Sequence, residues 1–313
     1  MKLLTPISRL GLLLALAWAT SPTALFAQDP AAETLQQRVG LPTQVASPTT
    51  PVKTDEDLGE ISVVQKAPVP ETFTFSTSQQ FFYTDNVFFT DVNPVGSTAY
   101  LGSYTASFVP YSLRDWTPRV AVQYNMVRYG SVASGDFDNE NISLSSQYVF
   151  SKDRSWTWTA SVNAARFTAP HANDHEFYKE FVYDNQISHV EKLSKTLPLF
   201  FVAAYDLAYH QANPADFDRL DNILSFSLVY YPLPSVSISS FVRPASRDYF
   251  TNTANQTDRT DFNLSEGLDV TWQPWKYASL SADFTHTNDY SSSTHQSYNE
   301  SSPGVSVTGT VKF

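Results

Sequence analysis

The chain has 313 residues, of which 14% are aromatic and 16% charged, and its formal net charge is −11 at pH 7. The acidic balance argues against nucleic acid as a partner, and the absence of cysteine excludes disulfides and thiol nucleophiles. The 17 Tyr and 22 Phe exceed the needs of one compact core and favour a chain that alternates apolar and polar side chains.

The first 27 residues have the pattern of a secretory signal peptide. Lys2 and Arg9 supply positive charge, an apolar run covers 10–18, and 24–27 offer a cleavage region. The apolar run is too short for a transmembrane helix, which takes about 20 residues. We expect export and cleavage after Ala27.

Residues 28–70 are rich in proline, glutamine, threonine and acidic residues. Such a composition cannot bury enough apolar surface to fold alone, so we expect a disordered periplasmic arm. The run Glu-Ile-Ser-Val-Val at 60–64 resembles the TonB box of energised transporters. No plug domain follows, and a chance extended segment is the better explanation of so short a run.

From residue 71 onward, apolar and polar side chains alternate with a period of two; Trp156 and Trp158, for example, oppose Thr157 and Thr159. The sequence predicts an all-β fold over 71–313: a closed, antiparallel, up-and-down transmembrane β-barrel of about 12 strands. The barrel must close because hydrocarbon cannot satisfy the backbone groups of a free edge. The twelve expected strands are 71–84, 98–111, 119–130, 140–151, 156–168, 176–190, 198–210, 219–231, 235–246, 260–273, 277–287 and 303–313.

The connections between these strands alternate in length. Short ones, such as 113–115 and 232–234, follow even-numbered strands, and longer polar ones, such as 288–302, follow odd-numbered strands. Outer-membrane barrels have short periplasmic turns and longer outer loops, so we expect both barrel ends in the periplasm. Rings beside the short turns predict a periplasmic aromatic girdle. They are Tyr111, Trp116, Phe150, Trp156, Tyr230, Tyr231, Trp272, Trp275 and Tyr277.

Two short motifs resemble those of known barrels. Residues 83–89, Tyr-Thr-Asp-Asn-Val-Phe-Phe, resemble a segment of porin-like barrels encoded beside exopolysaccharide operons, which implies an envelope channel or an accessory of polysaccharide export. Asp-Asn also begins turns, and Val-Phe-Phe also suits a membrane rim. The last strand ends at Phe313 and resembles the C-terminal signal read by the barrel-insertion machinery.

The polar face of the strands is expected to line a wet lumen. A weakly acidic bore would favour small neutral or cationic solutes; alternatively, its charges pair across a narrow lumen and plug it. The lumen candidates are Glu180, Asp184, Asp206, His210, Arg243, Asp269, Asp283 and Lys312. The expected partners are outer-membrane lipids, the insertion machinery and a small hydrophilic solute or glycan, and the oligomeric state stays open.

Glu266 interrupts the apolar row of its strand and is expected on the lipid side. Counting back from the turn at Trp275 places Glu266 opposite Phe284 and diagonal to His286, and Ser240 shares this face. The group resembles the lipid-facing Ser, His and Asn of the outer-membrane phospholipase, a twelve-stranded enzyme, which implies a lipid hydrolase; the third role lacks its Asn here. A local inversion, a bulge or a subunit contact is the plainer interpretation.

No cofactor and no metal are expected. His171, Asp174 and His175 share one outer loop, but a solvated loop accounts for them more simply than chelation. The sequence has no glycine-rich phosphate loop and no nucleophile elbow. We therefore predict a non-enzymatic, porin-like channel for small hydrophilic solutes or an accessory barrel of polysaccharide export, with a lipid hydrolase or a structural or adhesive barrel as the alternatives.

Overall fold

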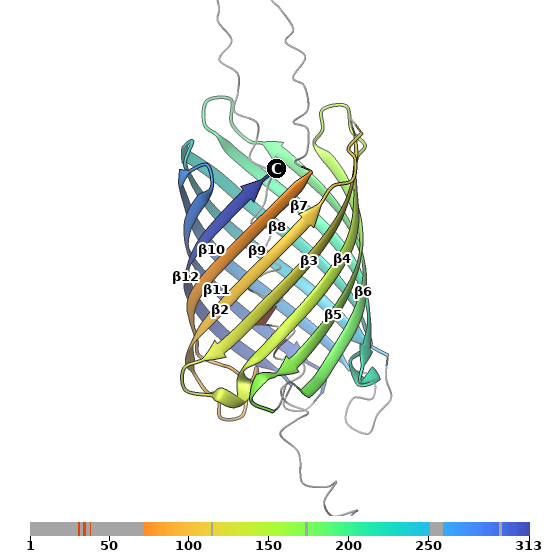
Figure 1. Ribbon diagram of the computed structural model, residues 1–313, viewed down its shortest axis with the longest axis vertical. Coiled ribbons are helices and arrows are strands. Elements are labelled where there is room, and N and C mark those ends of the chain that lie inside the picture. Colours follow the sequence, from red (N-terminus) through yellow and green to blue (C-terminus); the bar gives the residue numbers. More distant parts are fainter. Residues whose placement is uncertain are drawn as a thin grey trace, which may run out of the picture.

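The computed structural model describes residues 72–113, 115–172, 175–250, 259–293 and 296–313, together with Ala31, Thr34, Leu35 and Arg38. In these residues, twelve antiparallel strands form one closed barrel, and β1 (Phe73–Thr84) pairs with β12 (Tyr298–Lys312). Figure 1 shows how the strands tilt around the barrel. The predicted fold class is confirmed, whereas the expected signal peptide and the 60–64 run lie outside the described residues.

Each expected strand corresponds to one observed strand. The largest difference is in β12, which begins at Tyr298 rather than at residue 303. The prediction started this strand at Pro303, but the pairing with β11 continues through this proline to Tyr298. The remaining strands are β2 (Ser97–Phe108), β3 (Trp116–Tyr129), β4 (Phe137–Val149), β5 (Trp156–Ala169), β6 (His175–Lys192), β7 (Leu199–Asn213), β8 (Arg219–Leu233), β9 (Val236–Tyr249), β10 (Thr260–Trp275) and β11 (Ala278–Ser291).

The alternation in the strands puts apolar side chains outside and polar ones inside. In β11, Leu280 and Phe284 are 40% and 46% exposed, whereas Thr285 and Thr287 are 1% and 0% exposed. This distribution is the reverse of that in a water-soluble protein. It is the arrangement that a surrounding hydrocarbon phase requires.

The two ends of the barrel differ. The C-terminus and the short turns lie at one end, called the turn end here (top of Figure 1), and the longer connections lie at the other, the loop end. Exposed rings stand at the turn end, where Trp275 is 69% and Tyr277 52% exposed. The barrel closes at this end because the Phe313 N–H donates to the Phe73 carbonyl at 2.8 Å and the Phe73 N–H donates back at 3.2 Å.

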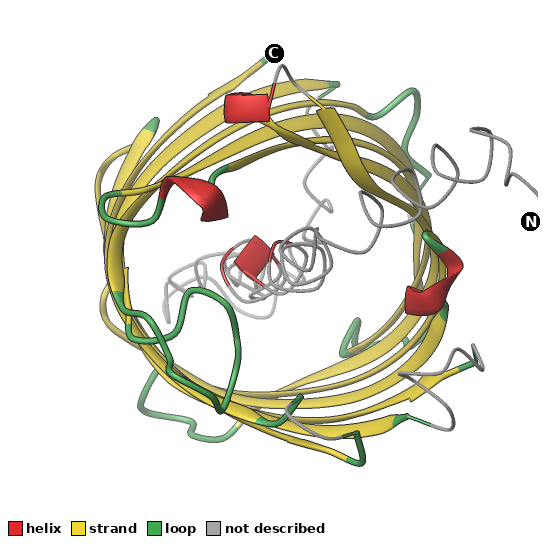
Figure 2. Cartoon of the chain, turned by 90° about the horizontal axis from the view of Figure 1, so that it is seen from below, coloured by secondary structure: helices red, strands yellow, loops and turns green. Residues whose placement is uncertain are grey.

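Short helical pieces occur at the loop end and inside the barrel. Three 3₁₀ helices, η1 (Ala133–Gly135), η2 (Pro170–Ala172) and η3 (Ala215–Phe217), belong to the loops. No helix among the described residues has the length and apolar character needed to span a bilayer. The helical residues of the N-terminal segment lie inside the ring of strands (Figure 2).

These four N-terminal residues differ from the disordered arm expected over 28–70. Ala31, Thr34, Leu35 and Arg38 are helical and buried, and their spacing of three and four places them on one helix face. The expectation considered the segment in isolation, where its composition cannot bury enough apolar surface to fold. In the structure, the inner wall of the barrel supplies the surface against which these four residues pack. The rest of 28–70 lies outside the described residues.

Part of the bore near the loop end is apolar. Ala31 and Leu35 join a buried cluster with inward-facing rings and aliphatic side chains of the strands and of the loop-end connections. The bore is therefore less uniformly polar than the expected row of Ser, Thr, Asn and Gln. The wall members are Phe82, Val87, Ala99, Leu101, Val127, Tyr129, Phe137, Phe167, Tyr178, Phe217 and Tyr249.

Candidate functional site in the bore

All eight ionisable residues predicted for the lumen stand on the inner row of their strands. Asp206, for example, lies between Tyr205 and Leu207, which are exposed on the outer wall. Lys312 lies at the turn end of β12 and is exposed. Seven of the eight lie deeper in the barrel, and they belong to different groups of contacts. These seven are Glu180, Asp184, Asp206, His210, Arg243, Asp269 and Asp283.

Three acids face the middle of the bore: Asp184, Asp206 and Asp269. Asp206 accepts a hydrogen bond from Gln186 Nε2 at 2.7 Å, and Asp269 accepts one from Thr271 Oγ1 at 2.9 Å. These donors are neutral, so the hydrogen bonds themselves leave the carboxylate charge in place. The predicted lumen residue Arg243 of β9 lies near enough to Asp206 to offset part of its charge. Fixed negative charge at this depth attracts cations into a wet bore.

Asp283, by contrast, is neutralised by the N-terminal segment. Arg38 Nη1 lies 2.5 Å from Asp283 Oδ2, and Gln80 Nε2 donates to the other carboxylate oxygen at 3.0 Å. Arg38 Nη2 also donates to the Ser302 carbonyl at 2.9 Å, and the guanidinium carbon lies 4.4 Å from the centroid of the Phe82 ring. Burial lowers the pKa of Arg38, and the Asp283 carboxylate opposes that shift. Arg38 thus holds the segment against β1, β11 and β12.

A second contact holds the same helix face. Thr34 Oγ1 lies 3.3 Å from the Tyr129 hydroxyl of β3, and both groups are buried. Together with Ala31 and Leu35 in the apolar cluster, these contacts hold the N-terminal residues against the inner wall. The sequence left open whether the lumen is plugged. These N-terminal residues occupy part of the lumen, as expected of a partial plug.

Glu180 and His210 belong to a buried network near the loop end. His210 Nδ1 lies 3.0 Å from Glu180 Oε2, and His210 Nε2 lies 3.2 Å from Asp221 Oδ2. Tyr178 donates its hydroxyl to Glu180 at 2.9 Å, and Arg219 Nε donates to Asp221 at 3.1 Å. The imidazole therefore lies between two carboxylates, and these charges pair with one another.

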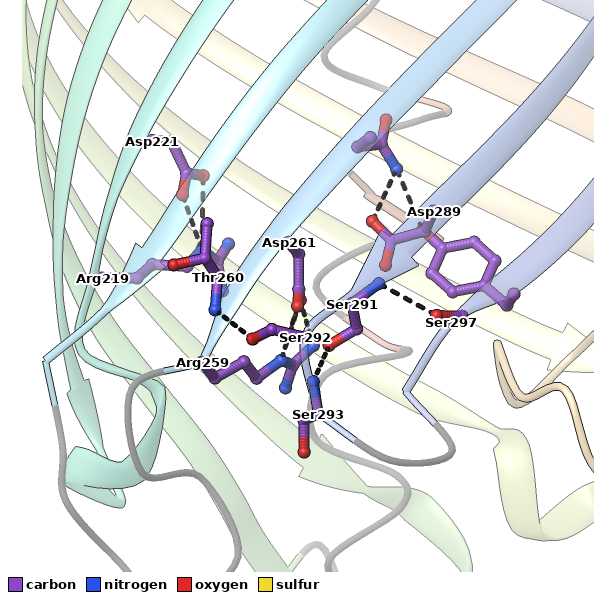
Figure 3. A network of polar contacts seen from close by, with 12 residues as sticks. Arg219, Asp221, Arg259, Thr260, Asp261, Asp289, Ser291, Ser292, Ser293 and Ser297 are labelled. Atoms are coloured by element: carbon purple, nitrogen blue, oxygen red, sulfur yellow. Dashed lines mark hydrogen bonds and ion pairs between the residues drawn. The ribbon is translucent and has the colours of Figure 1, made fainter.

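Sequence reasoning missed the arginine and aspartate pairs of this region. Arg219 pairs with Asp221 on β8, and Arg259 Nε donates to Asp261 at the start of β10 at 3.0 and 2.8 Å (Figure 3). The Tyr249 ring is near both arginines: its centroid lies 4.2 Å from the guanidinium carbon of Arg259 and 5.9 Å from that of Arg219. The repeated Arg-x-Asp spacing was the available signal, because residues two apart share one face of a strand.

The motif at 83–89 ends β1 and begins the loop that connects it to β2 at the loop end. Asn86 is 1% exposed; its Nδ2 donates to the Thr90 carbonyl at 2.9 Å and to the Asn299 carbonyl at 3.0 Å, and its Oδ1 accepts from the Thr90 N–H. Val87 joins the apolar cluster inside the barrel. The motif therefore has a structural role in holding this loop to β12.

On the outer wall, Glu266 and His286 are direct register partners on β10 and β11. The expected pairing of Glu266 with Phe284 was wrong by two residues, because the ladder continues to Trp275 and Ala278 and the turn lies later than the expected 274–276. Glu266 stays exposed on the outer row, and the ladder is regular around it, so neither an inversion nor a bulge occurs there. Ser240 pairs with Leu268 rather than with Glu266.

The loop histidine His171 has a different partner from the one considered. His171 Nε2 lies 2.7 Å from Asp136 Oδ2, and Asp174 lies outside the described residues. Within the described ranges, no three His, Asp, Glu or Cys side chains are grouped so that they could hold a metal ion.

Comparisons with known proteins identify the fold. No protein-family model matches the chain, and no curated protein matches its sequence. Among solved structures, the COG4313 outer membrane channel from Pseudomonas putida F1 is similar with a TM-score of 0.55 and 13% identity over 79% of this chain and 97% of that chain. The NanC porin (TM-score 0.44, 11% identity, 74% and 98%) and the KdgM porin in complex with disordered oligogalacturonate (0.43, 7%, 75% and 98%) are more distant. The chain thus has the fold of bacterial outer-membrane β-barrels.

Proposed function

We propose that the protein is an outer-membrane channel through which small hydrophilic solutes diffuse, with cations favoured. The observation that carries this proposal is the inner wall at mid-bore, where Asp184, Asp206 and Asp269 face the enclosed space. A twelve-stranded barrel encloses more room than an eight-stranded one, which side chains fill. The similar fold of an outer-membrane channel is in keeping with this proposal.

The turn end faces the periplasm in this proposal, and the loop end faces outward, as is usual for such barrels. The N-terminal helix face and the Arg219–Asp221 and Arg259–Asp261 pairs narrow the bore towards the loop end. A narrow path suits small solutes. No separate observation favours a glycan, because the motif that suggested polysaccharide export serves the first outer loop.

The proposal is tested with the purified barrel in a planar lipid bilayer under a KCl gradient. We expect discrete current steps and a reversal potential that reports cation preference. In the triple variant Asp184→Asn, Asp206→Asn and Asp269→Asn, the reversal potential moves towards zero, because the fixed charges that attract cations are gone.

The matched control neutralises two exposed acids of the turn end, Asp115→Asn and Asp153→Asn, and leaves the reversal potential unchanged. A barrel that gives no current, or a triple variant with unaltered selectivity, contradicts the proposal.

A further inference from the structure

A polar row crosses the lipid-facing wall of the barrel on three neighbouring strands. His286 of β11 pairs with Glu266 of β10 on one side and with Ser301 of β12 on the other. All three belong to the outward rows, because their neighbours two residues away include the exposed Leu268 and Phe284. This wall is not used by the proposed channel.

His286 and Ser301 form a hydrogen-bonded pair. His286 Nδ1 lies 2.9 Å from Ser301 Oγ, which is the distance expected between a nucleophilic hydroxyl and its general base. The backbone of Ser301 is held by Asp85 at the end of β1, whose Oδ1 accepts the Ser301 N–H at 2.8 Å. The hydroxyl therefore has a fixed position and an adjacent base.

Glu266 is the register partner of His286 on β10, the strand on the side away from Ser301. It is the seventh of the sixteen residues of β10, close to the middle of the strand, and it is exposed on the lipid-facing row. A lipid-facing charge is unfavourable, by about 2–4 kcal/mol for Arg or Lys at the midplane and less for an acid. In a catalytic triad, a carboxylate hydrogen-bonded to the histidine stabilises the imidazolium that forms when the histidine accepts a proton. Glu266 makes no ion pair with His286 in this structure, so this role requires its side chain to turn along the wall towards the neighbouring strand.

A shallow apolar hollow of about 400 Å³ lies on the same wall. Its lining includes Val270 of β10, Leu280 and Ala282 of β11, and Val305 and Val307 of β12. Ala282 is four residues from His286 along β11, about 13 Å at roughly 3.3 Å per residue. The hollow thus lies on the turn-end side of the Ser–His pair, at a distance that an acyl chain spans.

We propose that Ser301, His286 and Glu266 form a hydrolase site for acyl esters of membrane lipids, with the acyl chain in this hollow. Ser301 Oγ attacks the ester carbonyl carbon, and its proton passes to His286. The ester C–O bond breaks, and the departing alcohol takes the proton, so the acyl group stays on Ser301. Water, deprotonated by His286, then cleaves this acyl-serine and releases the fatty acid, and the serine oxygen recovers the proton.

The test uses the full purified barrel in detergent micelles with p-nitrophenyl dodecanoate, and in phosphatidylcholine vesicles with fatty acid release as the readout. A fluorophosphonate probe, followed by peptide mass spectrometry, identifies the reactive serine. We expect labelling at Ser301, and a loss of hydrolysis of about 10²-fold or more in Ser301→Ala and in His286→Ala. Glu266→Gln lowers the rate less, because the acid acts through the histidine.

The matched control is Ser240→Ala, which removes another lipid-facing serine whose register partners are Leu228 and Leu268 rather than a histidine. Its rate and labelling stay at the level of the unmodified protein. Heat-modifiable migration on gels verifies that each variant is a folded barrel. Hydrolysis no faster than that of Ser301→Ala, or labelling at a different serine, overturns the proposal, whatever the conductance of the barrel.

Discussion

Two charged pairs with the same spacing, Arg219 with Asp221 and Arg259 with Asp261, stand inside the barrel near the loop end. Asp221 and Asp261 are both 0% exposed. A buried charge is strongly destabilising when its partner is removed. At the residue scale, the stability of the barrel therefore depends on keeping both members of each buried ion pair.

We predict that Asp221→Asn destabilises the barrel by about 3–5 kcal/mol, because it leaves the buried Arg219 without its paired charge. The measurement is urea unfolding in lipid vesicles, followed by tryptophan fluorescence. Asp138→Asn is the control: Asp138 pairs with Arg128, which is half-exposed, so the loss should be about 1 kcal/mol or less. Equal losses in the two variants contradict the prediction.

A second prediction at this scale concerns Arg38. Arg38→Ala removes the ion pair with Asp283 and the hydrogen bond to Ser302, so the N-terminal helix face is held less firmly and single-channel conductance rises. Arg154→Ala is the control, since it breaks an exposed ion pair with Asp115 at a turn and leaves conductance unchanged. A conductance that does not respond to Arg38→Ala shows that this face does not limit the current.

The inward or outward direction of individual side chains could be predicted from alternation alone. It assigned Asp206 and Asp269 to the inner wall and Glu266 to the outer wall, as observed. Ser301 was missed because the prediction began the last strand at Pro303. The contacts of Arg38 were beyond reach as well, since they join residues more than 200 positions apart and no local pattern encodes them.

At the scale of elements, the period of two in the sequence predicts where the strands lie, but it does not predict which residues pair across neighbouring strands. All twelve strands were expected, but the extra residues beside two turns, between Tyr230 and Leu233 and between Trp272 and Trp275, shift the pairing. A shift at a turn carries through the whole hairpin. The partner of Glu266 was misplaced by two residues because β10 runs to Trp275, past the start of the expected turn at 274–276. The face of Glu266 was nevertheless predicted correctly.

The first outer loop, 85–96, gives a prediction at this scale. Asn86→Ala removes three hydrogen bonds, each worth about 1 kcal/mol, so the loop should detach from β12 and be cleaved faster by protease added to intact vesicles. Asn185→Ala, on the exposed outer row of β6, is the control and leaves cleavage unchanged. Equal cleavage rates in Asn86→Ala and the unmodified protein contradict the assigned role of this side chain.

At the scale of the whole molecule, closure is the central property. The backbone N–H and C=O groups of each strand form hydrogen bonds with two neighbouring strands. The last strand joins the first, and two backbone hydrogen bonds between Phe313 and Phe73 complete this join at the turn end. The Phe313 ring itself is 74% exposed. We infer that this ring is available to the insertion machinery before the barrel closes.

We predict that Phe313→Ala slows folding in membranes that contain the insertion machinery, measured as the fraction of heat-modifiable protein over time. The finished barrel should have normal conductance, because the ring does not face the bore. Phe284→Ala, which removes an exposed ring from the middle of β11, is the control and should insert at the normal rate. Equal insertion of Phe313→Ala and the unmodified protein refutes the signal role.

Arg38 touches Phe82, Asp283 and Ser302, which belong to the first strand and to the last two. One side chain thus spans the junction where the sheet joins itself. Because linked equilibria are reciprocal, each event favours the other: a docked Arg38 makes the join between β1 and β12 harder to separate, and an intact join makes Arg38 harder to release. Release of the N-terminal residues from the bore and separation of β1 from β12 are therefore coupled by the same interactions of Arg38.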